Sequence, residues 1–219
     1  MQRPSHSQLF DSNYVFWMSL CVSFFSLVLY RFSIVAPTWF DELFMKALLF
    51  GLPFWLYAKK SKHPPSFFGL EPKKFWVGAF NGLALGGLFS FVAILASSAR
   101  KSSILIPGLF QSNSFWWEFT LAFATAWWES LFFYGLILPV LKLKVKGEVN
   151  ALAYTTLLFL LFHIPNLLLK VGLSASLQPL LLLGFFAFGQ GILFLRTKSI
   201  ATVVVSHAFW GMALFVYGR

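Results

Sequence analysis

Long apolar runs recur along the whole sequence and constrain its fold more than any other feature. They approach or exceed the roughly 20 residues needed to cross a hydrocarbon core of about 30 Å, and only short connections separate them. Of the 219 residues, 58% are hydrophobic and 11% are charged, whereas about 25% are charged in an average soluble domain. The sequence therefore predicts an all-α, polytopic transmembrane bundle, with residues 1–219 forming a single integral membrane domain.

Seven transmembrane helices are expected. They cover residues 14–35, 40–58, 75–98, 114–140, 149–168, 177–195 and 199–217. The second helix carries Asp41, Glu42 and Lys46 in its first two turns, and Pro165 interrupts the fifth. The first apolar run lacks a small-residue cleavage site and a strongly basic lead, so it is interpreted as a retained helix and not as a signal peptide. It contains Cys21, the only cysteine, for which a buried packing role is expected.

The distribution of basic residues predicts the orientation in the membrane. With the amino terminus inside and the carboxyl terminus outside, eleven of the seventeen basic residues fall on the inner side, as the positive-inside rule requires. These eleven are Arg3, Lys59, Lys60, Lys62, Lys73, Lys74, Lys142, Lys144, Lys146, Arg196 and Lys198. The flanking residues account for the net charge of +10, and no basic soluble face is present for a nucleic acid. The expected partners are the lipid bilayer and a substrate within it, and no nucleic acid.

Three ionisable side chains fall well inside the predicted helices: Glu129, His163 and His207. A charge at mid-bilayer costs about 2.5–3.5 kcal/mol, so each should face the interior of the bundle and have a partner. Counted at 1.5 Å per residue from the inner basic flanks, their depths are about 20, 25 and 14 Å, a spread of roughly 11 Å. The three groups are therefore expected to meet.

A carboxylate and two imidazoles in a cavity of low dielectric constant have two chemistries open to them. One group can take a proton from water while another donates, which would activate water against an amide. Two histidines and a glutamate also make a catalytic zinc set, although the HExxH spacing is absent and the ligands would come from three helices. The residues alone leave both chemistries open, a metal- and cofactor-free site and, as the alternative, a zinc site.

Three stretches resemble the ordered motifs of a known family. They are ESLFFYG at 129–135, FLLFHIPN at 159–166 and GILFLRTKSIATVVVSHAFWG at 191–211. They are similar to the EExxxR, FxxxH and HxxxN motifs of the CPBP family of intramembrane proteases, which includes CAAX prenyl proteases and bacteriocin-processing proteins and is also called the Abi family. The resemblance covers the second half of the chain and implies a catalytic-type core at about 114–217.

The resemblance implies a metal-free hydrolysis of a membrane-anchored or lipid-modified protein or peptide. Glu129 would be the general base, His163 would orient the water with it, and His207 would donate to the oxyanion. Prokaryotic cytoplasmic membrane is the expected location.

The motifs are incomplete. Ser130 replaces the second glutamate, Tyr134 the arginine, and Gly211 the final asparagine. Loss of an oxyanion donor typically costs about 2.7–4 kcal/mol, so another donor is expected, with Asn166 the first candidate and Ser206 or Tyr134 the others.

Two further functions stay open. A non-catalytic, CPBP-like protein that binds or escorts a membrane partner would explain the three replaced motif residues. A small proton-coupled transporter would use Glu129 and the histidines as a proton relay, but no inverted repeat of broken helices is present. Asp41, Glu42 and Lys46 have a spacing that allows pairing at i, i+4 along one helix side, and they are interpreted as a solvated or lipid-facing group.

Overall fold

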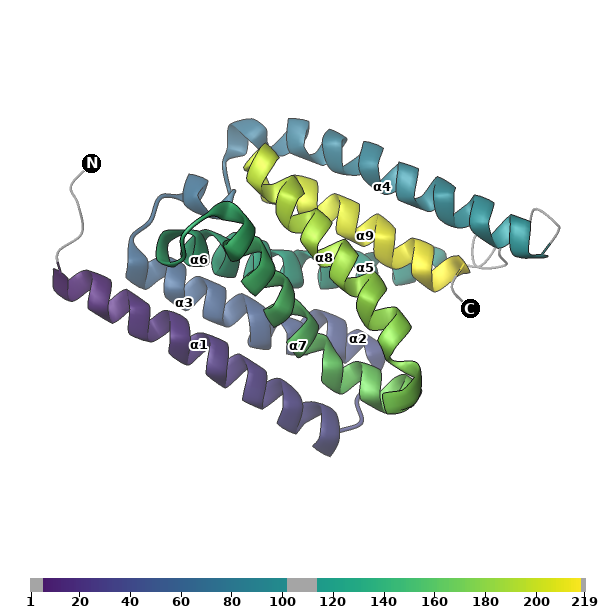
Figure 1. Cartoon of the computed structure of the whole chain (residues 1–219), viewed down its shortest axis with the longest axis horizontal. Coiled ribbons are helices and arrows are strands. Elements are labelled where there is room, and N and C mark those ends of the chain that lie inside the picture. The colour runs from purple at the N-terminus through teal and green to yellow at the C-terminus, as the bar shows by residue number, and fades with distance from the viewer. Residues whose placement is uncertain (1–5, 102–113, 218–219) are drawn as a thin grey trace.

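The computed structural model describes residues 6–101 and 114–217, and this part of the chain contains helices and no β-strand (Figure 1). The elements are α1 (His6–Ser33), α2 (Thr38–Phe40), η1 (Asp41–Met45), η2 (Ala47–Gly51), α3 (Leu52–Ser61), η3 (Pro65–Phe68), α4 (Pro72–Lys101), α5 (Phe115–Ser130), η5 (Leu131–Ile137), α6 (Leu138–Lys144), α7 (Glu148–Ala175), α8 (Leu177–Thr197) and α9 (Ile200–Tyr217). Of the short elements, η1, η2 and η5 are π-helical and η3 is a 3₁₀ turn.

Five helical segments within the described residues are long and apolar enough to cross a membrane. They are Ser12–Ser33, Pro65–Val92, Phe115–Lys144, Glu148–Lys170 and Leu177–Thr197, and a shorter apolar helix covers Ile200–Ala213. The protein is therefore an integral membrane helical bundle, as the sequence predicts. The expected second helix, 40–58, is not among these segments, because the chain there is divided into α2, η1, η2 and α3.

The expected interruption at Pro165 is not where the helix breaks. Helix α7 continues through Pro165, and its backbone leaves helical geometry at Gly172, which has φ 75° and ψ 172°. Proline is tolerated in transmembrane helices because neighbouring groups satisfy the backbone atoms that it frees. His163 and Asn166 therefore lie on one continuous helix.

The segment α5–η5–α6 forms the centre of the bundle. Every residue from 129 to 141 is buried. Helix α9 packs against α5 and α4, α7 packs against α8 and α1, and α3 packs against α1. Helices α1 and α4 lie at opposite edges of the bundle, with α7 and α8 crossing between them (Figure 1).

A stripe of glycines brings α4 close to α9. Gly78, Gly82 and Gly86 recur every four residues on α4. A Cβ added at Gly82 or Gly86 would meet α9 atoms at 2.5–2.6 Å, and one added at Gly78 would meet Ser199, just before α9, at 2.1 Å. Small residues at this spacing let two membrane helices approach closely. The stripe therefore fixes the position of α9, the helix that carries His207.

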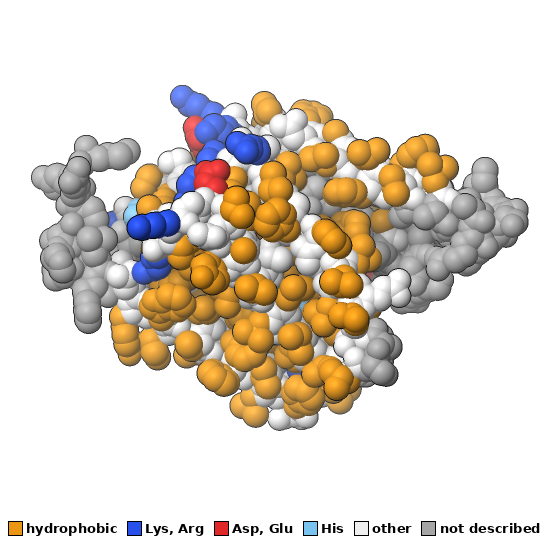
Figure 2. Space-filling model, in the orientation of Figure 1, with side chains coloured by type: hydrophobic (Ala, Val, Ile, Leu, Met, Phe, Trp, Pro, Cys, Tyr) orange, Lys and Arg blue, Asp and Glu red, His pale blue; other side chains and the backbone are white. Residues whose placement is uncertain are grey.

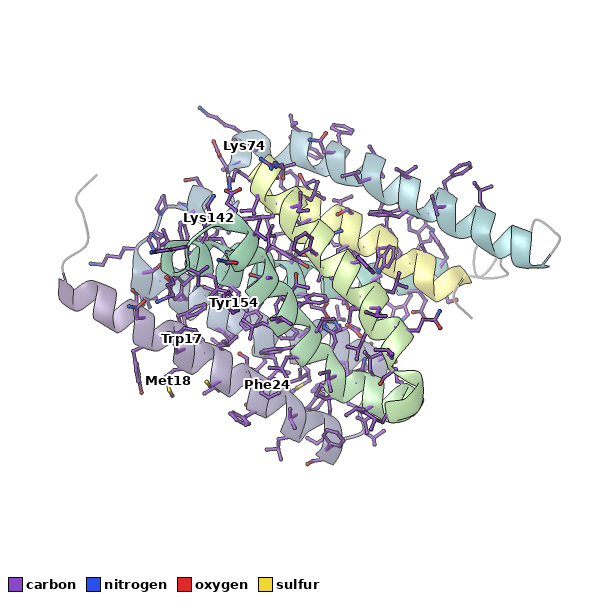
Figure 3. All side chains as sticks on the ribbon, viewed as in Figure 1. Trp17, Met18, Phe24, Lys74, Lys142 and Tyr154 are labelled. Carbon is purple, nitrogen blue, oxygen red and sulfur yellow. The ribbon has the colours of Figure 1, made fainter. Side chains whose placement is uncertain are left out.

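Hydrophobic side chains cover most of the face shown in Figure 2, and charged side chains gather at one edge. Lys74 and Lys142 mark that edge, while Trp17 and Met18 project from α1 away from the bundle (Figure 3). Cys21 is exposed on α1, so the expectation of a buried thiol is wrong. An apolar exterior with charge at one end is what a bilayer requires of a bundle.

Candidate active site

The carboxylate of Glu129 lies in the last turn of α5 and divides its two oxygens between different partners. Its side chain is only 5% exposed. Oε1 lies 2.8 Å from Nζ of Lys46, and Oε2 lies 3.6 Å from Nε2 of His163 and 3.7 Å from Nε2 of His207. The structure thus brings together the three side chains from α5, α7 and α9 that the sequence singles out.

The ring of His163 is held in place by Phe159, the residue one turn earlier on α7. Phe159 stacks on the imidazole with centroids 4.2 Å apart and planes 24° apart. The backbone oxygen of Phe159 lies 2.8 Å from Nδ1 of His163. A carbonyl oxygen only accepts hydrogen bonds, so Nδ1 carries the proton that it receives. In the neutral ring, Nε2 then presents its lone pair to Glu129.

The ring of His207 is oriented by a different kind of partner. Its Nδ1 lies 3.3 Å from the hydroxyl oxygen of Ser130, and Phe186 packs against the ring with centroids 4.9 Å apart. A serine hydroxyl can donate to an unprotonated Nδ1, and the proton of the neutral ring then resides on Nε2. With that tautomer, His207 points an N–H into the site where His163 points a lone pair.

The three side chains differ in how far they are covered. Glu129 and His207 are 5% and 9% exposed, while His163 is 23% exposed. Phe162, next to His163, contacts Phe24 of α1 with ring centroids 5.3 Å apart, and Figure 3 labels Phe24 on α1. His163 is therefore the most exposed of the three side chains.

Lys46 is part of this site, and the expectation that it is solvated or lipid-facing is wrong. Its side chain is 13% exposed, and besides Glu129 its Nζ contacts Glu42 Oε2 at 2.5 Å and Thr125 Oγ1 at 3.4 Å. The Thr125 hydroxyl donates to Glu42.

Asp41 also faces the protein, because it pairs with Arg31 at 2.5 Å and accepts a hydrogen bond from Tyr30.

The sequence does not reveal the role of Lys46, because Glu42, four residues earlier on the same helix face, is already a sufficient partner for its charge. The contact with Glu129 spans 83 positions of the chain and depends on the close packing of η2 on α5. That packing is visible at Gly51, where an added Cβ would lie 2.7 Å from the Trp128 ring. The available signal was an acid and a base inside an apolar stretch, which in a membrane need buried partners.

Comparison with known protein families gives a match to part of the chain. The model of the family Rce1-like, type II CAAX prenyl endopeptidase, matches residues 111–213. The matched residues make up just under half of the chain, and the match agrees with the resemblance of its motifs to those of CPBP proteins. Neither the curated proteins nor the solved structures contain a match.

Residues 111–213 include Glu129, His163 and His207, and they exclude Lys46 and Glu42. The part that resembles CPBP proteins therefore supplies the carboxylate and both imidazoles, and the amino-terminal helices supply the cation and a second carboxylate.

Two positions that depart from the CPBP motifs have partners of their own. Tyr134 is fully buried and its hydroxyl donates to the backbone oxygen of Ala187 at 3.1 Å. Ser130 contacts His207, as described above. Ser206, a further candidate donor, donates to Gln190 Oε1 at 2.9 Å. Tyr134 and Ser206 therefore already use their hydroxyl protons.

The remaining two positions of the CPBP comparison, Gly211 and Asn166, make no side-chain hydrogen bond within the described residues. Gly211 lies one turn after His207, and nothing stands within 4 Å of a Cβ added there. Asn166 is half-buried, and within the described residues it makes no hydrogen bond or ion pair. Three residues after His163 on the same helix, it lies near the face that carries the imidazole.

No group of three or more His, Cys, Asp or Glu side chains in residues 6–101 and 114–217 is arranged to hold a metal ion. A metal-free mechanism stays a prediction based on the resemblance to CPBP proteins.

Proposed function

We propose that the protein is a glutamate-dependent intramembrane endopeptidase that cleaves a membrane-anchored or lipid-modified protein or peptide. The single observation that carries the proposal is the convergence of two imidazole nitrogens on one oxygen of Glu129, at 3.6 and 3.7 Å. The family match supports the class of reaction. The choice of a lipidated or membrane-embedded substrate follows from that class and from the apolar surroundings of the site.

The opposite hydrogen-bonding characters of the two rings support the division of roles. A neutral His163 presents a lone pair to a carboxylate oxygen, and two acceptors that face each other require a donor between them. A water molecule supplies such a donor, one O–H to each group. Glu129 then removes a proton from this water as its oxygen attacks the amide carbon.

His207 acts on the substrate oxygen. Its Nε2–H donates to the oxyanion that forms when water adds to the amide carbon. When the intermediate collapses, the carbon–nitrogen bond breaks and the proton held by Glu129 passes to the leaving amine. Asn166 is the proposed second oxyanion donor, in the role for which Gly211 has no side chain.

Loss of the general base tests the proposal. In membranes of the cell that makes the protein, Glu129→Gln is expected to leave a membrane precursor uncut, with cleavage reduced about 10²- to 10⁴-fold. The same precursor should accumulate with His163→Ala and with His207→Ala. Quantitative proteomics of the membrane fraction, comparing wild type with Glu129→Gln, identifies the substrate and its cleavage site.

Glu118→Gln is the matched control, because Glu118 is the other glutamate of α5 and lies in its first turn. It should process the precursor at the wild-type rate. Normal processing by all three site variants, at equal protein levels, would refute the proposal.

The replaced motif residues favour one other function, a non-catalytic protein that binds or escorts a membrane partner. The same experiment separates the two. An escort protein would leave the termini of its partner unchanged in Glu129→Gln membranes and would change only the partner's amount or location. New termini on the partner protein that appear only when Glu129 is intact would exclude the escort function.

A further inference from the structure

A cluster contributed by two helical segments surrounds the ammonium group of Lys46. Three oxygen atoms lie around Nζ: Glu42 Oε2 at 2.5 Å, Glu129 Oε1 at 2.8 Å and Thr125 Oγ1 at 3.4 Å. An ammonium group has three N–H donors, so these three acceptors use all of them. Lys46 therefore has no free proton to offer an oxyanion while the cluster is intact.

The cluster acts on one half of the Glu129 carboxylate. Lys46 engages Oε1, and both imidazoles face Oε2. A carboxylate fixed through one oxygen cannot rotate about its last bond without losing the ion pair. Such restraint keeps Oε2 aimed at the space between the two rings, where the reacting water would be held.

We propose that Lys46, itself held by Glu42 and Thr125, is a positioning residue for Glu129 and supplies the buried cation of this active site. This inference rests on the proposed function and adds a residue outside the family match to it. Lys46 does not touch the reacting atoms; it sets the orientation of the carboxylate that does.

Charge balance explains why the cluster contains a second acid. Glu42, Lys46 and Glu129 alternate in sign, and their side chains are 20%, 13% and 5% exposed. Without Lys46, two carboxylates would face each other in apolar surroundings, which is more costly than losing either acid. The lysine is therefore the member whose loss most disturbs Glu129.

The position of the cluster is fixed from outside the catalytic helices. Asp41 starts η1 and is paired with Arg31 of α1, while Gly51 at the end of η2 lets the segment approach Trp128 of α5. The π turns of η1 and η2 lie on either side of Lys46. Extra residues in π turns are frequent at functional sites, where they change the direction of a side chain.

The cluster also accounts for the two replaced residues of the first motif. Where that motif has a second glutamate and an arginine, this chain has Ser130 and Tyr134, whose hydroxyls are bound to His207 and Ala187. An acid and a cation are nevertheless present beside Glu129, and they come from Glu42 and Lys46. The segment that packs against α5 thus supplies both an acid and a cation beside Glu129, which the first motif of CPBP proteins carries on one helix.

Steady-state kinetics of Lys46 variants in proteoliposomes test this role, with the substrate identified by proteomics. Lys46→Met is expected to lower kcat about 100-fold and to change KM less than threefold, because misplacing a catalytic group by about 1 Å costs rate without removing substrate contacts. Lys46→Arg keeps the charge and should recover at least tenfold of the loss. Lys74→Met removes a lysine from an exposed pair with Glu71 and should leave both constants unchanged.

A second measurement needs no activity. The melting temperatures of wild type, Lys46→Met, Glu129→Gln and the double variant form a cycle, and the two changes should be non-additive, with the double variant more stable than Lys46→Met alone. This readout stays interpretable if Lys46→Met folds poorly or if no cleavage is found for the wild-type protein.

The outcomes separate this inference from the proposed function. Wild-type kcat in Lys46→Met, with Glu129→Gln inactive, overturns the role of Lys46 and leaves the endopeptidase in place. Additive melting temperatures overturn it as well, and so does an Arg variant as slow as the Met variant. Non-additive melting temperatures without any cleavage by the wild type support the ion pair and refute the endopeptidase.

Discussion

At the scale of single residues, Gly211 is the position where activity should be gained. It lies four residues after His207 on one face of α9, with open space around its Cβ position. Gly211→Asn is therefore expected to add an amide donor beside the imidazole and to raise kcat about tenfold or more, toward the 10²–10³ that a full oxyanion donor contributes. Initial cleavage rates of the two proteins in proteoliposomes provide the measurement.

Gly211→Ala separates this effect from helix stabilisation. Alanine improves helix propensity by about 1 kcal/mol over glycine and adds no donor. It should raise the melting temperature and leave kcat unchanged. Equal rates for the Ala and Asn variants would show that Gly211 lies too far from the oxyanion to contribute.

Ser130 is expected to act through His207. Ser130→Ala removes the hydroxyl 3.3 Å from Nδ1, so the ring loses the partner that keeps its proton on Nε2. A hydrogen bond of this kind is worth about 0.5–1.5 kcal/mol, which predicts a fall in kcat of roughly twofold to tenfold with little change in KM. Ser206→Ala is the control, because Ser206 is the buried neighbour of His207 and bonds to Gln190; a matching fall there would count against the assignment.

The central part of the site could be predicted from the sequence because of its chemistry. Glu129, His163 and His207 are ionisable groups at similar depth. Because an unpaired ionisable group inside the bilayer is costly, such groups are expected to be each other's partners. Lys46 could not be predicted, since its partner across the bundle is chosen by packing: Gly51 against Trp128 brings the two segments together. The bond from Ser130 to His207 likewise depends on how α9 is rotated against α5.

At the scale of helices, the glycine stripe on α4 determines where α9 lies. A Cβ at Gly82 would stand 2.6 Å from the backbone oxygen of Thr202. Gly82→Leu should therefore push the two helices apart, destabilise the protein by about 1–3 kcal/mol or more, and reduce cleavage by displacing His207. Thermal unfolding in detergent measures the effect.

Gly87 on the same helix provides the comparison, because nothing lies within 4 Å of its Cβ position. Gly87→Leu should melt at or above the wild-type temperature and retain activity. If both leucine variants behave alike, close contact between α4 and α9 is not what stabilises this part of the bundle.

The turn between α3 and η3 should make stability depend on pH. Burial lowers the pKa of His63 below its ordinary value of 6.5, and the ring stacks on Phe67 with centroids 4.0 Å apart. A lowered pKa means that the folded protein favours the neutral ring. Its contribution to stability is therefore complete above pH 6.5 and is lost as the pH falls through the lower, folded value.

His63→Phe keeps an aromatic ring against Phe67 and removes the titration. The wild-type melting temperature should fall more between pH 7.5 and pH 5 than that of the variant, and the difference isolates His63 from the other histidines. Parallel melting curves across this range would show that the ring titrates equally in the folded and unfolded states.

The helices differ in how far the sequence predicts them. Long apolar runs predict α1, α4, α7 and α8 well, because length and hydropathy alone decide whether a helix can span. The sequence predicts one span over residues 40–58, and the structure divides this region at the π turns around Lys46. Pro165 does not interrupt α7 as the sequence predicts, since the backbone breaks at Gly172, where φ is positive.

At the scale of the whole molecule, basic side chains from three connections gather at one end. Burial, and next the charge of Lys142, lower the pKa of Lys198, and Glu148, Arg196 and Lys74 also act on it. The basic residues among them, Lys74, Lys142, Arg196 and Lys198, come from different parts of the sequence and belong to the set expected on the inner side. Figure 3 places Lys74 and Lys142 at this same end. The fold therefore unites the charges that the positive-inside rule assigns to the cytoplasm.

This end should face the cytoplasm, and the single cysteine makes the orientation measurable. In a Cys21→Ser background, which removes the only native thiol, Lys198→Cys places a thiol at the basic end. Val35→Cys places one after α1, at a fully exposed position. A membrane-impermeant maleimide applied to intact cells should label only the cysteine at 35, and the cysteine at 198 should react only after permeabilisation. This pattern is expected because a helical bundle with short loops inserts in the orientation that keeps most of its basic residues inside. The reverse labelling pattern would show that the basic end faces outward.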